Sequence, residues 1–137
     1  MHREVLVKGP KEVVLAYVDA FNRGDLETLC ALFAPGALTW GVLGWGEVEV
    51  ARPIWKELIE ALQIQLTVES IVAEGGTVAV RYTERGKSVG TFRGQGPTNK
   101  SYELIAMEFF EVKNERIHRR WGARDSGTMN RQLGFAG

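Results

Sequence analysis

The chain has 137 residues, which is typical of one domain, and its 45% hydrophobic and 25% charged residues are typical of a soluble globular protein. Lys and Arg together number 17, as do Asp and Glu, so the formal net charge of zero argues against binding to nucleic acid or to an anionic membrane. No apolar run approaches the roughly 20 residues of a membrane span, and we find no signal peptide at the N-terminus. We therefore expect a single cytoplasmic domain over residues 1–137.

Three stretches of the first half have apolar residues at helical spacing. This spacing predicts a helix over 10–23, a short helix that Asp25 caps and Pro35-Gly36 ends, and a helix over about 50–62. Before the last of these, residues 37–40 are predicted as a short extended piece, which leads into residues 41–46. This segment contains three glycines and predicts a mobile loop. Trp40 and Trp45 stand beside and within this loop, and we interpret them either as walls of a pocket or as residues that cover the core.

The period of the apolar residues changes to two after the third helix. Alternation over 64–73 predicts a strand with a β-bulge near Glu69-Ser70, and residues 74–76 predict a hairpin turn. The next strand begins at about Val78, is broken at 85–87 and continues as an extended segment to Gly94. Two more strands are predicted, over 101–112 and 116–122. The first of these is apolar on both faces, which predicts a central strand covered on both sides.

Helices followed by a run of long strands predict an α+β fold, in which three N-terminal helices pack in a curved, mostly antiparallel sheet. A curved sheet packed on helices forms a cone. If side chains do not fill the cone, it leaves an apolar pocket at its open end.

Several side chains near this expected pocket have the chemistry of a site. Asp125 follows Trp121 by four residues, and it is either a carboxylate that burial turns into a general base or the cap of a tail helix. Arg81 is either a group that holds a ligand oxyanion or a solvated cross-strand residue. A carboxylate among apolar neighbours, such as Glu108, needs a partner. We predict Asp125 as the catalytic residue. The predicted ligand contacts are Trp40, Trp45, Arg81, Met107, Glu108 and Trp121.

Parts of the sequence resemble a known family. The first helical pair, Phe21-Asn-x-Gly24-Asp25 with Leu29 and Phe33, is similar to that of the nuclear-transport-factor-2-like superfamily. Within it, the second half resembles the SnoaL-like polyketide cyclases. The stretches are Val78-Ala-Val-Arg81-Tyr-Thr, Gly86-x-x-x-Gly-Thr-Phe92-x-Gly94, Pro97-Thr-x-Lys100, and Ile117-x-x-x-Trp121-x-x-x-Asp125 with Gln132-Leu-Gly134.

The resemblance implies a cone-shaped α+β barrel with a cavity for a small hydrophobic molecule, and a homodimer formed through the sheet. It also implies an intramolecular aldol condensation that closes a ring, with an acid/base Asp at the position of Asp125 and with no metal or organic cofactor. Relatives commonly have histidine at two positions that hold Ser88 and Arg120 here. The cyclase reaction is therefore expected to proceed without those histidines.

Other functions of this fold stay open. An epoxide hydrolase like limonene-epoxide hydrolase needs an Asp–Arg–Asp relay, and Thr83 stands where the strand would need a carboxylate after Arg81. Chemistry like that of ketosteroid isomerase needs a pair of acids, and none stands out. The two histidines, His2 and His118, lack the spacing of zinc ligands. The cone would also suit a protein that binds a hydrophobic ligand without turnover, or a dimeric interaction module.

Overall fold

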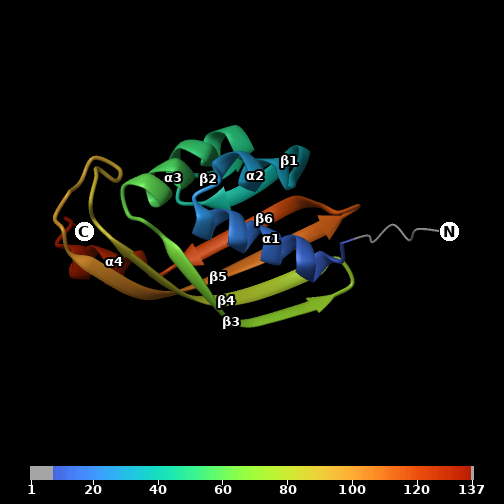
Figure 1. Cartoon of the computed structure of the whole chain (residues 1–137). Helices are drawn as coiled ribbons and strands as arrows, with labels where there is room; N and C mark the ends of the chain where they lie inside the picture. Colours follow the sequence, from blue (N-terminus) through green and yellow to red (C-terminus); the bar gives the residue numbers. More distant parts are fainter. Residues whose placement is uncertain (1–7, 137) are drawn as a thin grey trace.

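Four helices and six strands follow one another along residues 8–136, the part of the chain that the computed structural model describes (Figure 1). In chain order they are α1 (Pro10–Arg23), α2 (Leu26–Ala31), β1 (Phe33–Gly41), β2 (Gly44–Glu47), α3 (Val48–Glu60), β3 (Gln65–Glu74), β4 (Thr77–Lys87), β5 (Ser101–Lys113), β6 (Arg116–Arg124) and α4 (Ser126–Leu133). None of these helices is long and apolar enough to cross a membrane.

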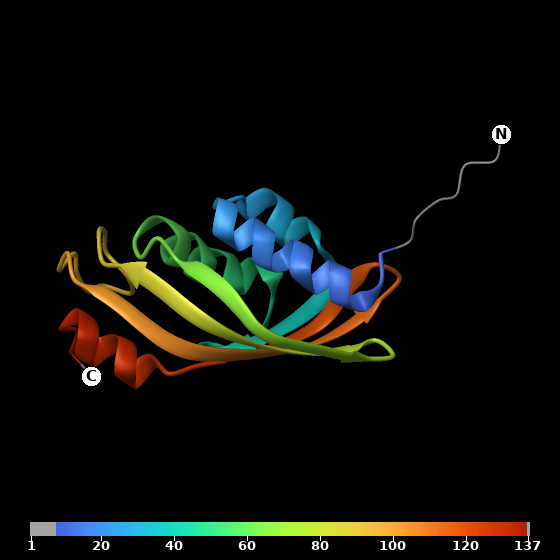
Figure 2. The same ribbon diagram turned by 60° about the horizontal axis from the view of Figure 1, so that its bottom comes forward.

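The strands form one curved sheet in the order β2-β1-β6-β5-β4-β3. Only the β1–β6 pair is parallel, and the other four pairs are antiparallel. Helices α1, α2 and α3 cover one face of the sheet, which we call the inner face (Figure 2). The predicted α+β fold with helices in a curved sheet is confirmed, although the sheet stays open and does not close into a barrel.

The ends of the first two helices follow from local chemistry. Pro10 starts α1, and Gly24 ends it in the left-handed conformation at φ 70°. The Asp25 carboxylate caps α2 by accepting the N–H of Thr28 at 3.1 Å. The third helix begins and ends two residues before its predicted limits, 48–60 against 50–62.

The predictions around Pro35 and Gly86 were wrong. Helix α2 ends at Ala31, and Pro35 lies in β1. The β1–β6 register is irregular between Phe33 and Leu38, so the sheet needs no N–H donor at Pro35. Residues 41–46 form the β1–β2 hairpin instead of a free loop. Strand β4 continues without a break through Gly86. The glycine at this position is explained by close packing, because a side chain there would collide with the Leu62 carbonyl and the Tyr102 ring. The extended segment predicted up to Gly94 is not a strand.

The prediction for β3 and its turn is confirmed, and the prediction for β5 was wrong in one respect. The β3–β4 register shifts between Val68 and Ser70, as expected for a bulge. Strand β5 is central but covered only on its inner face, because α1, α2 and α3 all pack on that side. On its outer face Ile105, Met107 and Phe109 are 57%, 55% and 44% exposed.

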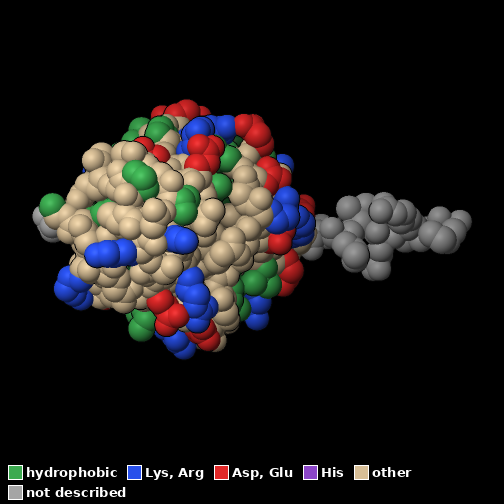
Figure 3. All heavy atoms as spheres, turned by 60° about the vertical axis from the view of Figure 1, so that its left-hand side comes forward, with side chains coloured by type: hydrophobic (Ala, Val, Ile, Leu, Met, Phe, Trp, Pro, Cys, Tyr) green, Lys and Arg blue, Asp and Glu red, His purple; other side chains and the backbone are tan. Residues whose placement is uncertain are grey.

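The core lies between the helices and the inner face of the sheet. Tyr17 of α1 is fully buried at its centre, in edge contact with the rings of Phe21 and Phe110 at centroid distances of 5.2 and 5.1 Å. At the end of the molecule that carries α4, positive and negative side chains are interspersed (Figure 3). This end therefore presents no large field of one sign.

Candidate active site

A buried ion pair with a tyrosine attached lies on the inner face of the sheet. Glu108 of β5 accepts two hydrogen bonds at its Oε2 atom, from the Tyr17 hydroxyl at 2.7 Å and from Arg120 Nε at 2.6 Å. The Glu108 and Arg120 side chains are only 7% and 13% exposed. Burial raises the pKa of Tyr17 well above its usual value, so its hydroxyl stays protonated. The second oxygen of Glu108, Oε1, receives no hydrogen bond from residues 8–136.

Arg120 remains charged in this setting. Burial by itself lowers the pKa of the guanidinium, but the charge and hydrogen bond of Glu108 outweigh burial and leave the pKa above its usual value. The guanidinium also lies over the Trp55 ring, 5.8 Å from its centroid, which is within cation–π range. Its Nη1 atom makes a long hydrogen bond of 3.4 Å to the Trp40 carbonyl. The other terminal nitrogen, Nη2, makes no hydrogen bond within residues 8–136, so its N–H groups can bind a ligand.

A second cluster of the same composition lies beside the first. Glu84 of β4 accepts the Tyr102 hydroxyl at 2.6 Å on Oε2 and Arg124 Nε at 3.1 Å on Oε1, and Arg124 Nη2 also binds Oε2. Burial, followed by the nearby Glu84 carboxylate, raises the pKa of Tyr102. Both carboxylate oxygens of Glu84 are therefore occupied, in contrast to Glu108. The second cluster therefore links β4, β5 and β6 and leaves no oxygen of Glu84 for a ligand.

A small space separates the two clusters, because two residues between them have little or no side chain. Ala106 and Gly122 face inward from β5 and β6, and Gly122 pairs with Glu108 in the register. A side chain at Gly122 would collide with the Arg120 guanidinium. The resulting space of about 30 Å³ is lined by both glutamates and both arginines. It is also lined by Tyr82, whose buried hydroxyl has no hydrogen-bond partner within residues 8–136.

A second space of about 60 Å³ adjoins the first and has a largely apolar lining. The two share Leu58, Arg120, Gly122 and Arg124, and together we call them the inner cavity. Its walls are the β1–β2 hairpin and α3, which contribute Val42, Leu43, Val50, Ala51 and Ile54. The inner cavity therefore combines a polar floor with an apolar mouth, which is the usual composition of a small-molecule site. Its two parts are much smaller than the roughly 300–1,000 Å³ of typical ligand pockets.

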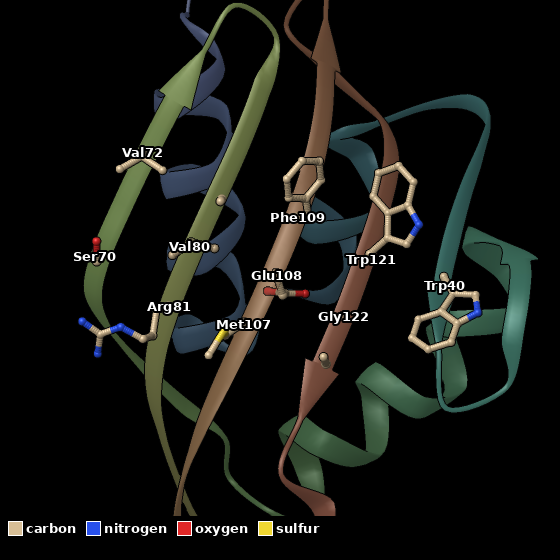
Figure 4. Close-up of a pocket in the computed structure, with 12 residues that line it drawn as sticks. Trp40, Ser70, Val72, Val80, Arg81, Met107, Glu108, Phe109, Trp121 and Gly122 are labelled. Carbon is tan, nitrogen blue, oxygen red and sulfur yellow. The ribbon is translucent and has the colours of Figure 1, made fainter.

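The outer face of the sheet carries most of the residues that the sequence analysis assigned to a pocket. A groove of about 470 Å³ on this face is lined by Trp40, Arg81, Met107 and Trp121 among others (Figure 4). Trp45 contacts Trp121 edge-on at 5.6 Å. Figure 4 shows Trp40, Arg81, Met107 and Trp121 on the side of the sheet away from the helices. Of the seven predicted site residues, only Glu108 directs its functional group into the inner cavity.

Asp125 lies at the beginning of α4, where it caps the helix. Its carboxylate accepts the Thr128 N–H at 3.1 Å and the Thr128 hydroxyl at 2.6 Å. These bonds lower the pKa of Asp125, and the residue is exposed to solvent. The described geometry therefore matches the capping alternative. Asp125 lines neither the inner cavity nor the outer groove.

The positions where relatives commonly have histidine serve different purposes here. Ser88 is fully buried, and its hydroxyl accepts the Thr98 N–H at 3.0 Å, so it holds the loop that precedes β5. Arg120 is part of the first cluster. Sequence reasoning did not assign Tyr17, Tyr82 or Gly122 to a site. A signal for Tyr82 was present, since Val78, Val80, Tyr82 and Glu84 share the buried parity of β4.

The fold and this geometry can be compared with known proteins. The profile of the SnoaL-like polyketide cyclases matches residues 11–133, which is most of the chain. The chain belongs to this family. IdmH from Streptomyces antibioticus, a proposed polyketide cyclase, is 30% identical, with 93% of this chain and 99% of that chain covered at a TM-score of 0.80. No curated protein matches the sequence significantly.

Other solved structures share the fold at lower identity. AclR from Streptomyces galilaeus, a proposed hydroxylase, is 24% identical, with 91% of this chain and 80% of that chain covered at a TM-score of 0.84. An LEH-like epoxide hydrolase of M. tuberculosis is 17% identical, with 90% and 88% covered at a TM-score of 0.71. These proteins are named for three different activities, so likeness of fold alone does not choose between them.

Proposed function

We propose that the inner cavity is the active site of a cofactor-free enzyme that performs acid/base chemistry on a small hydrophobic molecule. The reaction would be a ring closure of the aldol type, as in polyketide cyclases. The observation that carries the proposal is the unequal use of the two buried glutamates. Glu84 has both oxygens occupied, whereas Glu108 keeps one oxygen without a hydrogen bond beside a cavity with an apolar mouth.

The roles follow from what each group presents to the cavity. Glu108 Oε1 would take a proton from a carbon next to a carbonyl group, which leaves an enolate. The terminal N–H groups of Arg120 would stabilise the enolate oxygen, and this stabilisation is strong in a site that excludes water. The enolate carbon would then attack a second carbonyl of the same molecule. The protonated Glu108 would return its proton to the new alkoxide, so that the enzyme ends as it began.

The proposal assigns the acid/base role to Glu108 and leaves Asp125 as a helix cap. A carboxylate is a weak base when both of its oxygens accept hydrogen bonds and water surrounds it. Asp125 is in that position, since both of its oxygens accept hydrogen bonds from Thr128. Glu108 is shielded from water and lines the cavity.

Substitution of Gly122 by valine is expected to abolish ligand binding, because the new side chain fills the space between the two clusters. Acetophenone is a suitable probe, and its binding is followed through the backbone amide signals of Ala106 and Gly122 in NMR titrations. Ala79 is the matched control, since it lines only the outer groove. Loss of binding in Ala79→Val, with binding retained in Gly122→Val, would place the ligand outside and contradict the proposal.

We also propose that a second copy of the chain covers the outer face of the sheet. Apolar side chains are exposed across its whole width, from Val72 on the edge strand β3 to Trp40 and Trp45 on β1 and β2. Exposed apolar patches of this extent mark interaction sites. The patch faces away from the helices and has no cover within residues 8–136. In a dimer with a twofold axis, the patch of one copy would pack against the same patch of the other copy.

The expected mass in solution is that of a dimer, measured by light scattering at micromolar concentration. Phe109→Lys should shift the mass toward a monomer, because it places a charge at the centre of the patch, where Phe109 packs on Trp121 at 5.6 Å. Glu111→Lys, further along the same face of β5, carries the same charge as a control. A monomeric wild-type protein would contradict the dimer and leave the proposal for the inner cavity unaffected.

A further inference from the structure

Tyr82 has a buried hydroxyl group that the fold does not use. The residue is 1% exposed, and its hydroxyl has no hydrogen-bond partner within residues 8–136. Buried polar groups are nearly always paired, and a buried donor without a partner costs stability. The hydroxyl lines the deep part of the inner cavity together with Glu108 and Arg120. A ligand in the cavity could supply the hydrogen-bond acceptor that the Tyr82 hydroxyl lacks.

Two other tyrosines in the same core provide a direct comparison. Tyr17 and Tyr102 are also buried, and their hydroxyls donate to Glu108 at 2.7 Å and to Glu84 at 2.6 Å. Each of these tyrosines belongs to one of the two clusters. Tyr82 lies between the clusters, on β4 opposite Ala106, where the small side chain leaves space in front of it. The fold therefore gives two of the three hydroxyls a hydrogen bond, and the third has none within residues 8–136. That third hydroxyl lies near the Glu108 carboxylate, and burial, followed by this charge, raises the pKa of Tyr82 well above its usual value.

The charges around the cavity indicate which kind of ligand oxygen would meet this hydroxyl. Glu84 and Glu108 are each paired with one arginine, so the four charges on the cavity floor cancel. A ligand that enters as an anion would add an uncompensated buried charge, which is costly. A neutral carbonyl oxygen adds none, and it can accept hydrogen bonds from Tyr82 and Arg120 together.

We propose that Tyr82 is a ligand-binding residue whose hydroxyl donates a hydrogen bond to the oxygen of a neutral ketone or aldehyde. The inference rests on the proposed function of the inner cavity and names the substrate class and a further residue for it. The same hydrogen bond strengthens when the carbonyl oxygen gains negative charge in the transition state, so Tyr82 would join Arg120 in stabilising the enolate. Glu108 would remain the only group that accepts the proton.

The stability of the ligand-free protein provides the first test. Tyr82→Phe removes an unsatisfied hydroxyl, so we expect the melting temperature to rise by roughly 2–5 °C. Tyr102→Phe is the matched control, because it removes a buried hydroxyl that donates to Glu84, and its melting temperature is expected to fall. If Tyr82→Phe lowers the melting temperature as Tyr102→Phe does, the Tyr82 hydroxyl holds the fold together and the inference is wrong.

Ligand binding provides the second test, with acetophenone and cumene as a ketone and a hydrocarbon of the same shape, and benzoate as an anion. The wild type should prefer acetophenone to cumene by roughly tenfold, the worth of one good hydrogen bond. Tyr82→Phe should lose most of this preference, because only Arg120 still donates to the ketone, and it should bind cumene as before. Benzoate should bind more weakly than acetophenone to both proteins. The NMR titration that reports on Ala106 and Gly122 gives each affinity.

The outcomes separate this inference from the proposed function. If the preference of Tyr82→Phe for acetophenone is as large as that of the wild type, or if benzoate binds best, the inference is overturned while the inner cavity remains the binding site. If none of the three probes shifts the amide signals of Ala106 and Gly122, the proposed function fails and the inference fails with it.

Discussion

Glu108→Gln is expected to lower the rate of proton abstraction by at least roughly 100-fold, the usual contribution of a general base. The amide keeps the shape of the side chain and can still accept the Tyr17 hydroxyl, but it cannot take a proton from carbon. The measurement is exchange of the acetophenone methyl protons in D2O, followed by NMR with and without the protein. This reaction contains the proposed first step and needs no knowledge of the natural substrate.

Two matched variants separate the roles of the carboxylates. Glu84→Gln changes a glutamate that has the same kinds of partner, Tyr102 and Arg124, but has no free oxygen. It is expected to lower stability as Glu108→Gln does, with a much smaller effect on exchange. Asp125→Asn retains a good helix cap and should leave exchange unchanged. If Asp125→Asn instead causes the larger loss, the acid/base role belongs to Asp125, as the family resemblance implied, and the proposal for Glu108 is wrong.

Arg120→Met is expected to destabilise the protein by about 3–5 kcal/mol, the usual effect of removing one partner from a buried ion pair. The loss arises because Glu108, whose side chain is 7% exposed, would be left buried without its counter-charge, and it must either stay charged or take up a proton at a cost in free energy. The contact of the guanidinium with the Trp55 ring at 5.8 Å is lost as well. Urea unfolding followed by tryptophan fluorescence gives the free energy of unfolding for each variant.

The double variant Glu108→Gln/Arg120→Met tests the cause of this loss. It contains neither charge, so it should recover most of the stability that Arg120→Met loses, because neutral replacement of a buried pair is often tolerated. Proton exchange should remain absent, since the base is still missing. A double variant as unstable as Arg120→Met would show that Arg120 supports the fold through packing and not through its pairing with Glu108.

The element types could largely be predicted from the sequence, because they depend on local patterns. Helical spacing of apolar residues predicted α1 and α3 to within about two residues, and Asp25 was correctly placed as a cap. Strand β1 was predicted only in part, as the extended piece over 37–40, because its parallel partner, β6, lies more than 70 positions later in the chain. No local pattern around Pro35-Gly36 reveals that pairing. The unbroken course of β4 through Gly86 was missed for a similar reason, since the glycine is required by contacts with Leu62 and Tyr102.

The sequence by itself determined the family, the α+β class and the alternation of strands β3, β4 and β5, since all three depend on residue types at short spacings. It also indicated Glu108 as a carboxylate in need of a partner. Only the tertiary structure decided which face of each strand lies beneath the helices. That choice directs Met107 and Trp121 outward, and it brings Tyr17, 91 positions away in the chain, to the carboxylate of Glu108. The physical reason is that strand parity defines two faces, whereas burial of one face depends on where distant helices pack.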